Sequence, residues 1–176
     1  NQVGQTEQKE YVYVPEYLEL DDNTNSSYSN MTVQGDKLYY TNYQWDEASG
    51  ESKVVLGAYS LTDGSREDLP ITINADGGGI YSMQADAEGN IYTAEFEWNA
   101  TEGDDAYTQQ TTVLHKYDAS GTELMAQDIT DIMQQDENNS YVGSMCLDDQ
   151  GRFYISSDSL IRLFGSDGQF QGAVQT

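Results

Sequence analysis

The chain has 176 residues, 37% of them hydrophobic, so it is long enough to bury a core as one domain. It carries 31 Asp and Glu against 7 Lys and Arg, a formal net charge of -24. This charge repels phosphate backbones and anionic lipid, which excludes nucleic acid and membrane-surface partners. A charge of this size is typical of a well-solvated surface. The alternative is that it attracts cations or basic partners.

Cysteine usage and apolar runs narrow the class further. The single cysteine, Cys146, excludes an intramolecular disulfide framework, and its alternating apolar surroundings predict a small buried residue. No apolar run of roughly 18 residues occurs, so direct membrane insertion is not expected. Residues 1–10 are predicted to be a disordered polar linker, such as remains after removal of a leader, and residues 11–176 a single domain.

The first predicted element is an additional strand over residues 11–21, where Pro15 indicates an edge position or a bulge. A unit of four short strands over residues 29–73 follows. Its second strand alternates with period two and places large residues on one face. These residues are Tyr39, Thr41, Tyr43 and Trp45.

Two further units, over residues 79–127 and 141–176, repeat this pattern. In the second unit the matching residues are Tyr92, Ala94, Phe96 and Trp98. An apolar residue followed by Tyr opens the second strand of each unit, at Leu38-Tyr39, Ile91-Tyr92 and Phe153-Tyr154. Glycines at matching turns supply the positive φ that tight hairpins need, and they are Gly64, Gly89, Gly121, Gly151 and Gly168.

A short helical turn is predicted in the connection between the second and third units. There Ile129, Ile132 and Met133 lie at helical spacing behind Asp128.

Three such units predict an all-β fold of about three four-stranded antiparallel β-propeller blades, forming a partial propeller or part of a larger one. A generic antiparallel sandwich gives some of the same signals, but the units also agree in strand order and turn position. Propellers close with about four to eight blades. The alternatives are therefore a longer parent chain, a homodimer that completes the ring, and an open arc.

The third unit resembles blades of the NHL type, which place an Asp and a Gly before a Tyr-containing strand. The matching segments are Cys146–Ser156, Ile161–Phe164 and Asp167-Gly168. From Tyr11 to Val174 the chain also resembles the N-terminal propeller region of extracellular solute-binding lipoproteins of Gram-positive gut bacteria. The resemblance implies a parent protein anchored at the cell surface, in which the solute-binding domain of an ABC transporter follows the propeller. These residues hold no such domain, so it implies a context and no activity.

The turns of a four-stranded meander alternate between the two faces of the disc. We call the face with the first and third turns the first-turn face, and the face with the second turns and the links between units the second-turn face. The first-turn face is expected to be plain. The second-turn face is expected to be elaborated, with long connections of the kind that carry binding sites, at residues 46–52, 74–79, 99–110 and 128–140.

Candidate binding residues lie in or beside these long connections. They are Trp45, Trp98, Asp46, Glu47, Glu102, Asp104 and Asp105. The two indoles suit stacking on a sugar or on a peptide aromatic, so a glycan or a protein is the expected partner, and packing between blades is the alternative. Glu102, Asp104 and Asp105 form the best local calcium candidate, although no spacing matches a dedicated calcium loop. No metal or cofactor is expected.

Motifs for catalysis are missing from the sequence. His115, the only histidine, is expected to be a structural or surface residue, and Gly77-Gly78-Gly79 lacks the Lys of a phosphate loop and predicts a flexible connection. The sequence therefore favours a non-catalytic extracellular binding or scaffold module with the acidic second-turn face as its recognition surface. The alternatives are a carboxylate-dependent hydrolase or lyase with acids on the strands that line the central channel, and a structural acidic spacer.

Overall fold

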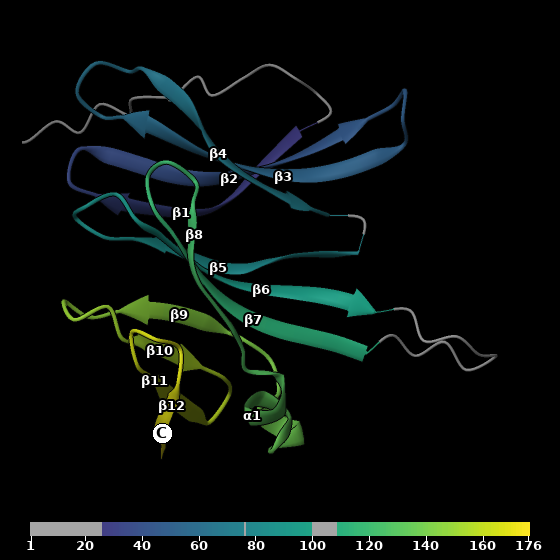
Figure 1. The fold of residues 1–176 in the computed structure, drawn as a ribbon, viewed down its shortest axis with the longest axis vertical. Helices are drawn as coiled ribbons and strands as arrows, with labels where there is room; N and C mark the ends of the chain where they lie inside the picture. Colours follow the sequence, from purple (N-terminus) through teal and green to yellow (C-terminus); the bar gives the residue numbers. More distant parts are fainter. Residues whose placement is uncertain (1–25, 76, 100–108) are drawn as a thin grey trace, which may run out of the picture.

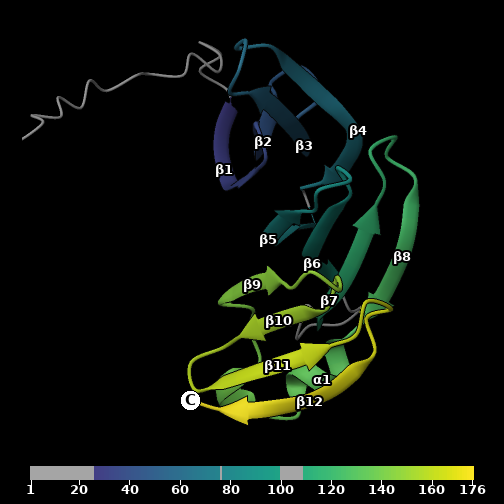
Figure 2. The same cartoon turned by 90° about the vertical axis from the view of Figure 1, so that its left-hand side faces the viewer.

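The computed structural model describes residues 26–75, 77–99 and 109–176. They form three four-stranded antiparallel sheets in which strands adjacent in sequence are adjacent in space. The sheets stack along an arc, with the first strand of each sheet on the concave side and the last on the convex side (Figures 1 and 2). The prediction of three four-stranded antiparallel units is confirmed.

We call each sheet a blade. Blade 1 contains β1 (Ser26–Gln34), β2 (Lys37–Asp46), β3 (Glu51–Ser60) and β4 (Arg66–Asn74). Blade 2 contains β5 (Gly78–Ala85), β6 (Ile91–Asn99), β7 (Gln109–Tyr117) and β8 (Glu123–Asp128). Blade 3 contains β9 (Ser144–Leu147), β10 (Phe153–Ser156), β11 (Leu160–Phe164) and β12 (Phe170–Gln175). The predicted linker 1–10 and strand 11–21 lie outside the described residues.

The connection between blades 2 and 3 contains helix α1 (Thr130–Gln134) and the short 3-10 helix η1 (Glu137–Asn139). The helical turn predicted behind Asp128 is thus confirmed. Arg162 of β11, which is 2% exposed, anchors this connection by hydrogen bonds. Its guanidinium donates to the carbonyl of Asn139 at 2.7 Å and to that of Met133 at 3.3 Å. No helix in the described part of the chain is long and apolar enough to cross a membrane.

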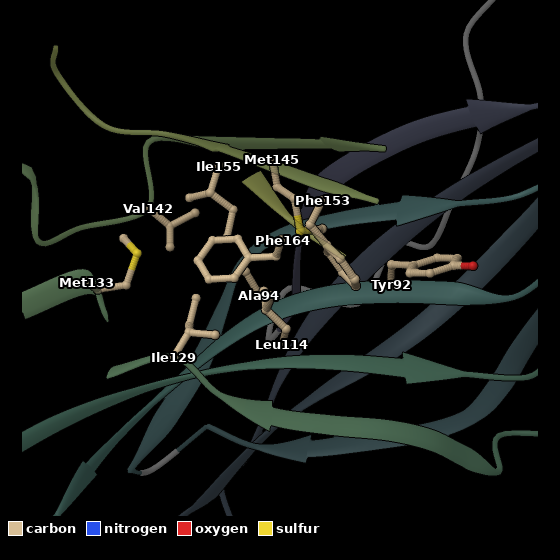
Figure 3. Packing of buried hydrophobic residues seen from close by; sticks show 10 residues of the cluster. All are labelled: Tyr92, Ala94, Leu114, Ile129, Met133, Val142, Met145, Phe153, Ile155 and Phe164. Carbon is tan, nitrogen blue, oxygen red and sulfur yellow. The ribbon is translucent and has the colours of Figure 1, made fainter. Parts of the chain in front are cut away.

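The buried core consists of two clusters, one at each junction between blades. The first includes Tyr39 and Leu56 of blade 1 with Met83 and Ile91 of blade 2. The second joins blade 2 to blade 3 and α1, and it contains Tyr92, Ala94, Leu114, Ile129, Met133, Val142, Met145, Phe153, Ile155 and Phe164 (Figure 3). Because side chains alternate along a strand, the neighbours Ile91 and Tyr92 serve different junctions. Each fully buried large side chain stabilises the fold by about 1.5–3 kcal/mol.

A bulge in β1 ties blade 1 to blade 2. The pairing register of β1 with β2 shifts between Ser29 and Thr32, and Asn30 in between has a φ of 48°, a left-handed conformation that Asn tolerates. The Asn30 side-chain amide donates to Thr41 Oγ1 at 3.3 Å and to the carbonyl of Ile80 at 3.4 Å. The bulge thereby aims a polar side chain into the gap between the two blades.

The prediction that Cys146 is buried is wrong, because its thiol is exposed. Its neighbour Met145 is 3% exposed and packs against blade 2. Alternation along β9 therefore turns Cys146 to the opposite face of blade 3.

Candidate functional site

The second-turn face is less elaborated than predicted at two of its four connections. Strand β2 continues to Asp46 and β3 starts at Glu51, so the predicted loop 46–52 is a tight hairpin. The pairing of β2 with β3 continues up to the turn, with Trp45 opposite Ser52 and Asp46 opposite Glu51. The predicted loop 74–79 is also short, because β4 ends at Asn74 and β5 starts at Gly78.

The glycine run in that link is not a flexible connection, which corrects the sequence-based interpretation. Gly78 and Gly79 open β5 and pair with Glu97 and Phe96. A Cβ on Gly78 would lie 2.5 Å from the carbonyl oxygen of Phe96, and one on Gly79 would lie 2.9 Å from its ring. These glycines therefore allow β5 to approach the Phe96 ring and backbone closely.

The other two connections differ from each other. The predicted connection 128–140 is present and contains α1 and η1. In the predicted connection 99–110, residues 100–108 lie outside the described part of the chain, and with them the candidates Glu102, Asp104 and Asp105. Among the residues that the structure does describe, no group of three or more His, Cys, Asp or Glu is placed to hold a metal ion.

Asp46, a predicted binding residue, closes its own hairpin. Its Oδ1 accepts the backbone amides of Ala48 at 2.8 Å and Ser49 at 3.3 Å, and Gly50 N donates to the Asp46 carbonyl at 2.8 Å. The hydrogen bonds from Ala48 and Ser49 lower the pKa of the Asp46 carboxyl. Glu47 lies within this turn. Asp46 therefore stabilises the turn of the hairpin that carries Trp45.

Both predicted tryptophans are exposed at the second-turn ends of their strands. Trp45 is 43% and Trp98 46% exposed, so neither is buried between blades. The strand ends that carry them lie on the same side of the molecule, at the right of Figure 1. The Trp98 ring meets Phe96 edge-on with centroids 6.3 Å apart, and Phe96 in turn packs on Tyr81 at 4.6 Å.

A groove of about 200 Å³ opens between blades 1 and 2 beside this aromatic end. Its described lining residues are Ser29, Asn30, Thr41, Tyr43, Val54, Ala75, Gly78, Gly79, Ile80 and Phe96. The polar side is built from hydroxyls and the bulge amide, with Ser29 Oγ 3.0 Å from Thr41 Oγ1. The Tyr43 hydroxyl lies 2.7 Å from Ser52 Oγ, and Ser52 borders the shallow depression around Trp45. The groove and the depression are thus neighbours.

Sequence reasoning identified the tryptophans but missed the polar side of this groove. Ser29 and Asn30 look like ordinary members of an alternating strand, because the bulge that redirects them has no unique sequence signature. The available signal was an Asn beside a predicted strand, because Asn tolerates the left-handed conformation that this bulge requires. We call Tyr43, Trp45, Trp98 and the groove the aromatic end.

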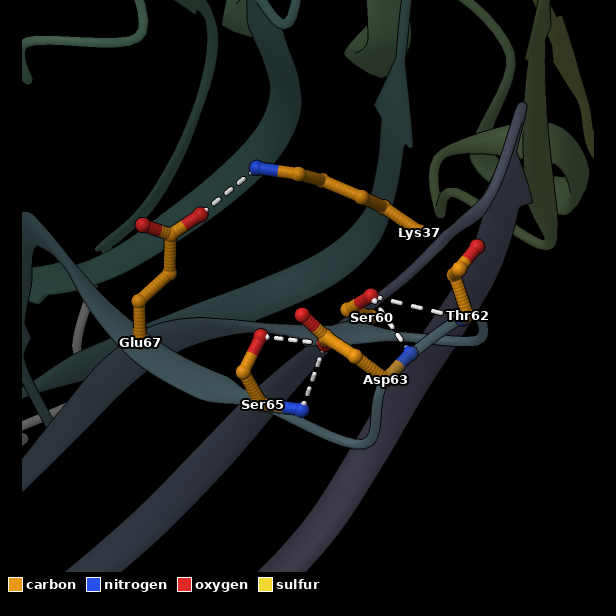
Figure 4. A network of polar contacts seen from close by, with 6 residues as sticks. All are labelled: Lys37, Ser60, Thr62, Asp63, Ser65 and Glu67. Carbon is orange, nitrogen blue, oxygen red and sulfur yellow. Dashed lines mark hydrogen bonds and ion pairs between the residues drawn. The ribbon is translucent and has the colours of Figure 1, made fainter.

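The first-turn face is not plain, contrary to expectation. It carries a depression of about 510 Å³ between the first turns of blades 1 and 2, and one of about 690 Å³ between those of blades 2 and 3. The acids that line them are Asp36, Glu67, Asp68, Asp86, Glu88, Asp148 and Asp149. Lys37 donates to Glu67 at 2.6 Å in the first depression (Figure 4).

Several carboxylates on this face are engaged in turns. Asp86 Oδ1 accepts the amides of Glu88 and Asn90, at 3.0 and 2.9 Å, while Oδ2 accepts Tyr92 OH at 3.0 Å. Although partial burial opposes it, these bonds hold the pKa of Asp86 below its usual value. Asp63 likewise accepts the amide and hydroxyl of Ser65, and the hydrogen bonds from Ser65 lower its pKa to about 2 (Figure 4). These aspartates fix turn geometry.

A buried polar cluster occupies blade 2 on the side facing blade 1. Glu95 is 8% exposed and its Oε1 accepts Thr93 Oγ1 at 2.5 Å and Tyr117 OH at 3.0 Å. His115 stacks on Tyr117, with Nε2 3.6 Å from Glu95 Oε2 and Nδ1 3.1 Å from Glu123 Oε2. Burial raises the pKa of Glu95, although His115 and the two hydroxyls partly oppose the rise. None of the depressions described above is lined by this cluster.

The strands on the concave side are β1, β5 and β9, and these three strands contain no Asp or Glu.

Comparison with known proteins bears on the fold alone. No protein-family model and no curated protein sequence matches the chain. The β-propeller domain of the Trilobed protease from Pyrococcus furiosus, described as an open velcro topology, is similar with a TM-score of 0.50 and 9% identity, over 87% of this chain and 44% of that one. A protein of unknown function from Bacteroides caccae gives a TM-score of 0.46 and 13% identity, over 85% and 57%.

The fold is thus of the β-propeller class, here as three successive blades. The chain spans less than half of the length of the protease propeller domain. At this level of identity the similarity defines architecture and carries no activity across.

Proposed function

We propose that this chain is a non-catalytic binding module of a β-propeller, and that the aromatic end of its second-turn face takes up a glycan. The observation that carries the proposal is the exposure of Trp45 and Trp98, at 43% and 46%, near the ends of β2 and β6. These two strand ends lie on one side of the molecule (Figure 1). Exposure of the large apolar surface of an indole to water is unfavourable, and a ligand that covers it removes this cost. A sugar ring offers a flat apolar face on which an indole can stack.

The groove beside the indoles supplies what a glycan needs besides stacking. Ser29, Asn30 and Thr41 present hydroxyl and amide groups, and Tyr43 is 38% exposed at its rim. A net charge of -24 disfavours anionic ligands, which leaves neutral or basic ones. Neutral glycans match hydroxyls, amides and aromatic rings better than a flat protein surface does, because the groove is small.

Two rival functions receive less support. A hydrolase or lyase with acids lining the central channel would need carboxylates on the concave strands, and β1, β5 and β9 contain none. Glu95, the buried acid with the raised pKa, is enclosed by Thr93, His115 and Tyr117. A purely structural acidic spacer would gain nothing from exposed tryptophans.

The sequence resemblance adds a setting to this proposal. We propose that the module belongs to an exported lipoprotein held at the cell surface, in which a solute-binding domain of an ABC transporter follows the propeller. In that setting the aromatic end would capture the sugar-containing solute, or the surface glycan, near the transporter.

The test is a binding screen of neutral glycans and of peptides, followed by substitution at the aromatic end. Trp45→Ala should weaken a glycan about tenfold, because an aromatic stacking contact is worth about 0.5–1.5 kcal/mol beyond its area. Leu61→Ala is the matched control, since Leu61 is 49% exposed in a turn on the first-turn face. Equal binding by both variants would contradict the site, and a peptide as the only saturable ligand would contradict the glycan.

A further inference from the structure

Each blade repeats a set of contacts toward the blade that follows it. At the first-turn face, the Tyr39 hydroxyl of blade 1 approaches Gly89 in the first turn of blade 2, 3.8 Å from where a Cβ would lie. The Tyr92 hydroxyl of blade 2 approaches Gly151 of blade 3 in the same way, at 3.4 Å. Both glycines have positive φ. Tyr154 of blade 3 is the third tyrosine in this series, because it holds the same position in its strand.

The middle of the junction repeats as well. Leu56 of blade 1 pairs with Thr41, and Leu114 of blade 2 pairs with Ala94, and each leucine is 0% exposed under the next blade. The covering side chains are Met83 and Ile91 at the first junction and Met145 and Phe153 at the second. Ile161 is the corresponding residue of blade 3, and it remains partly exposed.

The outer strands repeat a third contact. A Cβ on Gly121 would lie 2.5 Å from the Pro70 carbonyl oxygen of β4, and a Cβ on Gly168 would lie 2.6 Å from Gln127 Cβ of β8. The corresponding residue of β12 is Val174, which pairs with Ile161 as Gln127 pairs with Leu114. Val174 is 67% exposed.

These positions define one continuous surface, the outer face of blade 3. Cross-strand pairing places its residues side by side, and they are Ser144, Cys146, Tyr154, Ser156, Ile161, Leu163, Gly172 and Val174. None of them is charged, on a chain whose net charge is -24. An uncharged face with three apolar side chains, one of which holds the position of the fully buried Leu56 and Leu114, is typical of an interface.

We propose that the outer face of blade 3 is the docking surface for a fourth blade of the same propeller. The occupant is defined by the two junctions already present, which the face continues. It is a four-stranded antiparallel blade that lays an apolar pair over Ile161, a glycine turn against Tyr154 and a second glycine turn against Val174. Propellers contain about four to eight blades, so a blade that packs on a third one is part of this fold class.

Cys146 reports the cover directly, because it is the only cysteine of these 176 residues and its thiol is exposed on this face. The experiment measures maleimide labelling of the full-length protein as its own cells produce it, relative to the same protein unfolded in urea. The reference is a Ser49→Cys, Cys146→Ser variant, because Ser49 is exposed in the β2–β3 turn away from the face. We expect Cys146 to label several-fold more slowly than the reference, because Thr32 and Gln84, which hold the same position in blades 1 and 2, each contact the next blade.

Equal relative rates for Cys146 and the reference would overturn the proposal. Protection of Cys146 that disappears on dilution would also overturn it, because the face would then be covered by a second copy. Protection that is independent of concentration supports a blade within the same molecule.

Discussion

Aspartate carboxylates at the turns illustrate how this acidic chain uses its charge at the scale of single residues. Asp46, Asp63, Asp86 and Asp148 each accept amides of their own turn. A carboxylate held by several donors favours its charged form, so these acids are committed to backbone geometry. Counting acids in loops therefore overstates how many are available for a ligand.

Glu95 behaves in the opposite way, and its substitution gives a pH-dependent prediction. Burial raises its pKa, so the folded state keeps the proton to higher pH than the unfolded state does. The free energy of unfolding then falls as pH rises from about 4.3, the unfolded value, through the raised folded value. Glu95→Gln should remove this loss, so the variant should gain stability relative to the parent between about pH 4 and about pH 8.

Urea unfolding at the two pH values measures the effect. Glu123→Gln is the matched control, because Glu123 contacts the same His115 but its side chain is 52% exposed. A Glu95→Gln variant whose stability relative to the parent does not change with pH would contradict the assignment of Glu95 as a buried, destabilising acid.

At the scale of elements, alternation and turn glycines were sufficient to predict all three four-stranded units. The period of two in Tyr39, Thr41, Tyr43 and Trp45 places these side chains on one face of the strand, which is a local property. Loop lengths were harder, because the chain around Asp46 reads as a loop by composition although Trp45 and Ser52 keep the ladder paired. Gly78 and Gly79 also led to a wrong loop prediction. Glycine is needed at these positions because Phe96 lies close to them, and that contact is visible only in the folded structure.

The third turn of blade 2 offers a test of how closely successive blades pack. Gly121→Ala should cost about 1–2 kcal/mol for its left-handed φ and about 1–3 kcal/mol more for overpacking against Pro70. Gly35→Ala shares the positive φ but has open space around the new methyl group, so it should cost only the first amount. Denaturant unfolding compares the two. A Gly121→Ala variant as stable as Gly35→Ala would contradict the close inter-blade contact.

At the scale of the whole molecule, the three blades form an arc whose two faces differ in chemistry. The first-turn face has the larger depressions and many acids, while the second-turn face has the exposed indoles and a small polar groove. Sequence placed the tryptophans on the second-turn side from their position at strand ends. It could not supply the groove, because that depends on the Asn30 bulge and on the packing of blade 1 against blade 2.

The most direct test of the central claim is acrylamide quenching of tryptophan fluorescence, with and without a neutral glycan. The chain contains only two tryptophans, Trp45 and Trp98, so the signal reports the aromatic end alone, and acrylamide is neutral and insensitive to the net charge. The exposures of 43% and 46% predict efficient quenching of the folded protein and protection when the glycan binds. Indoles that are shielded from acrylamide in the unliganded protein, or quenching that no glycan changes, would contradict an exposed recognition surface.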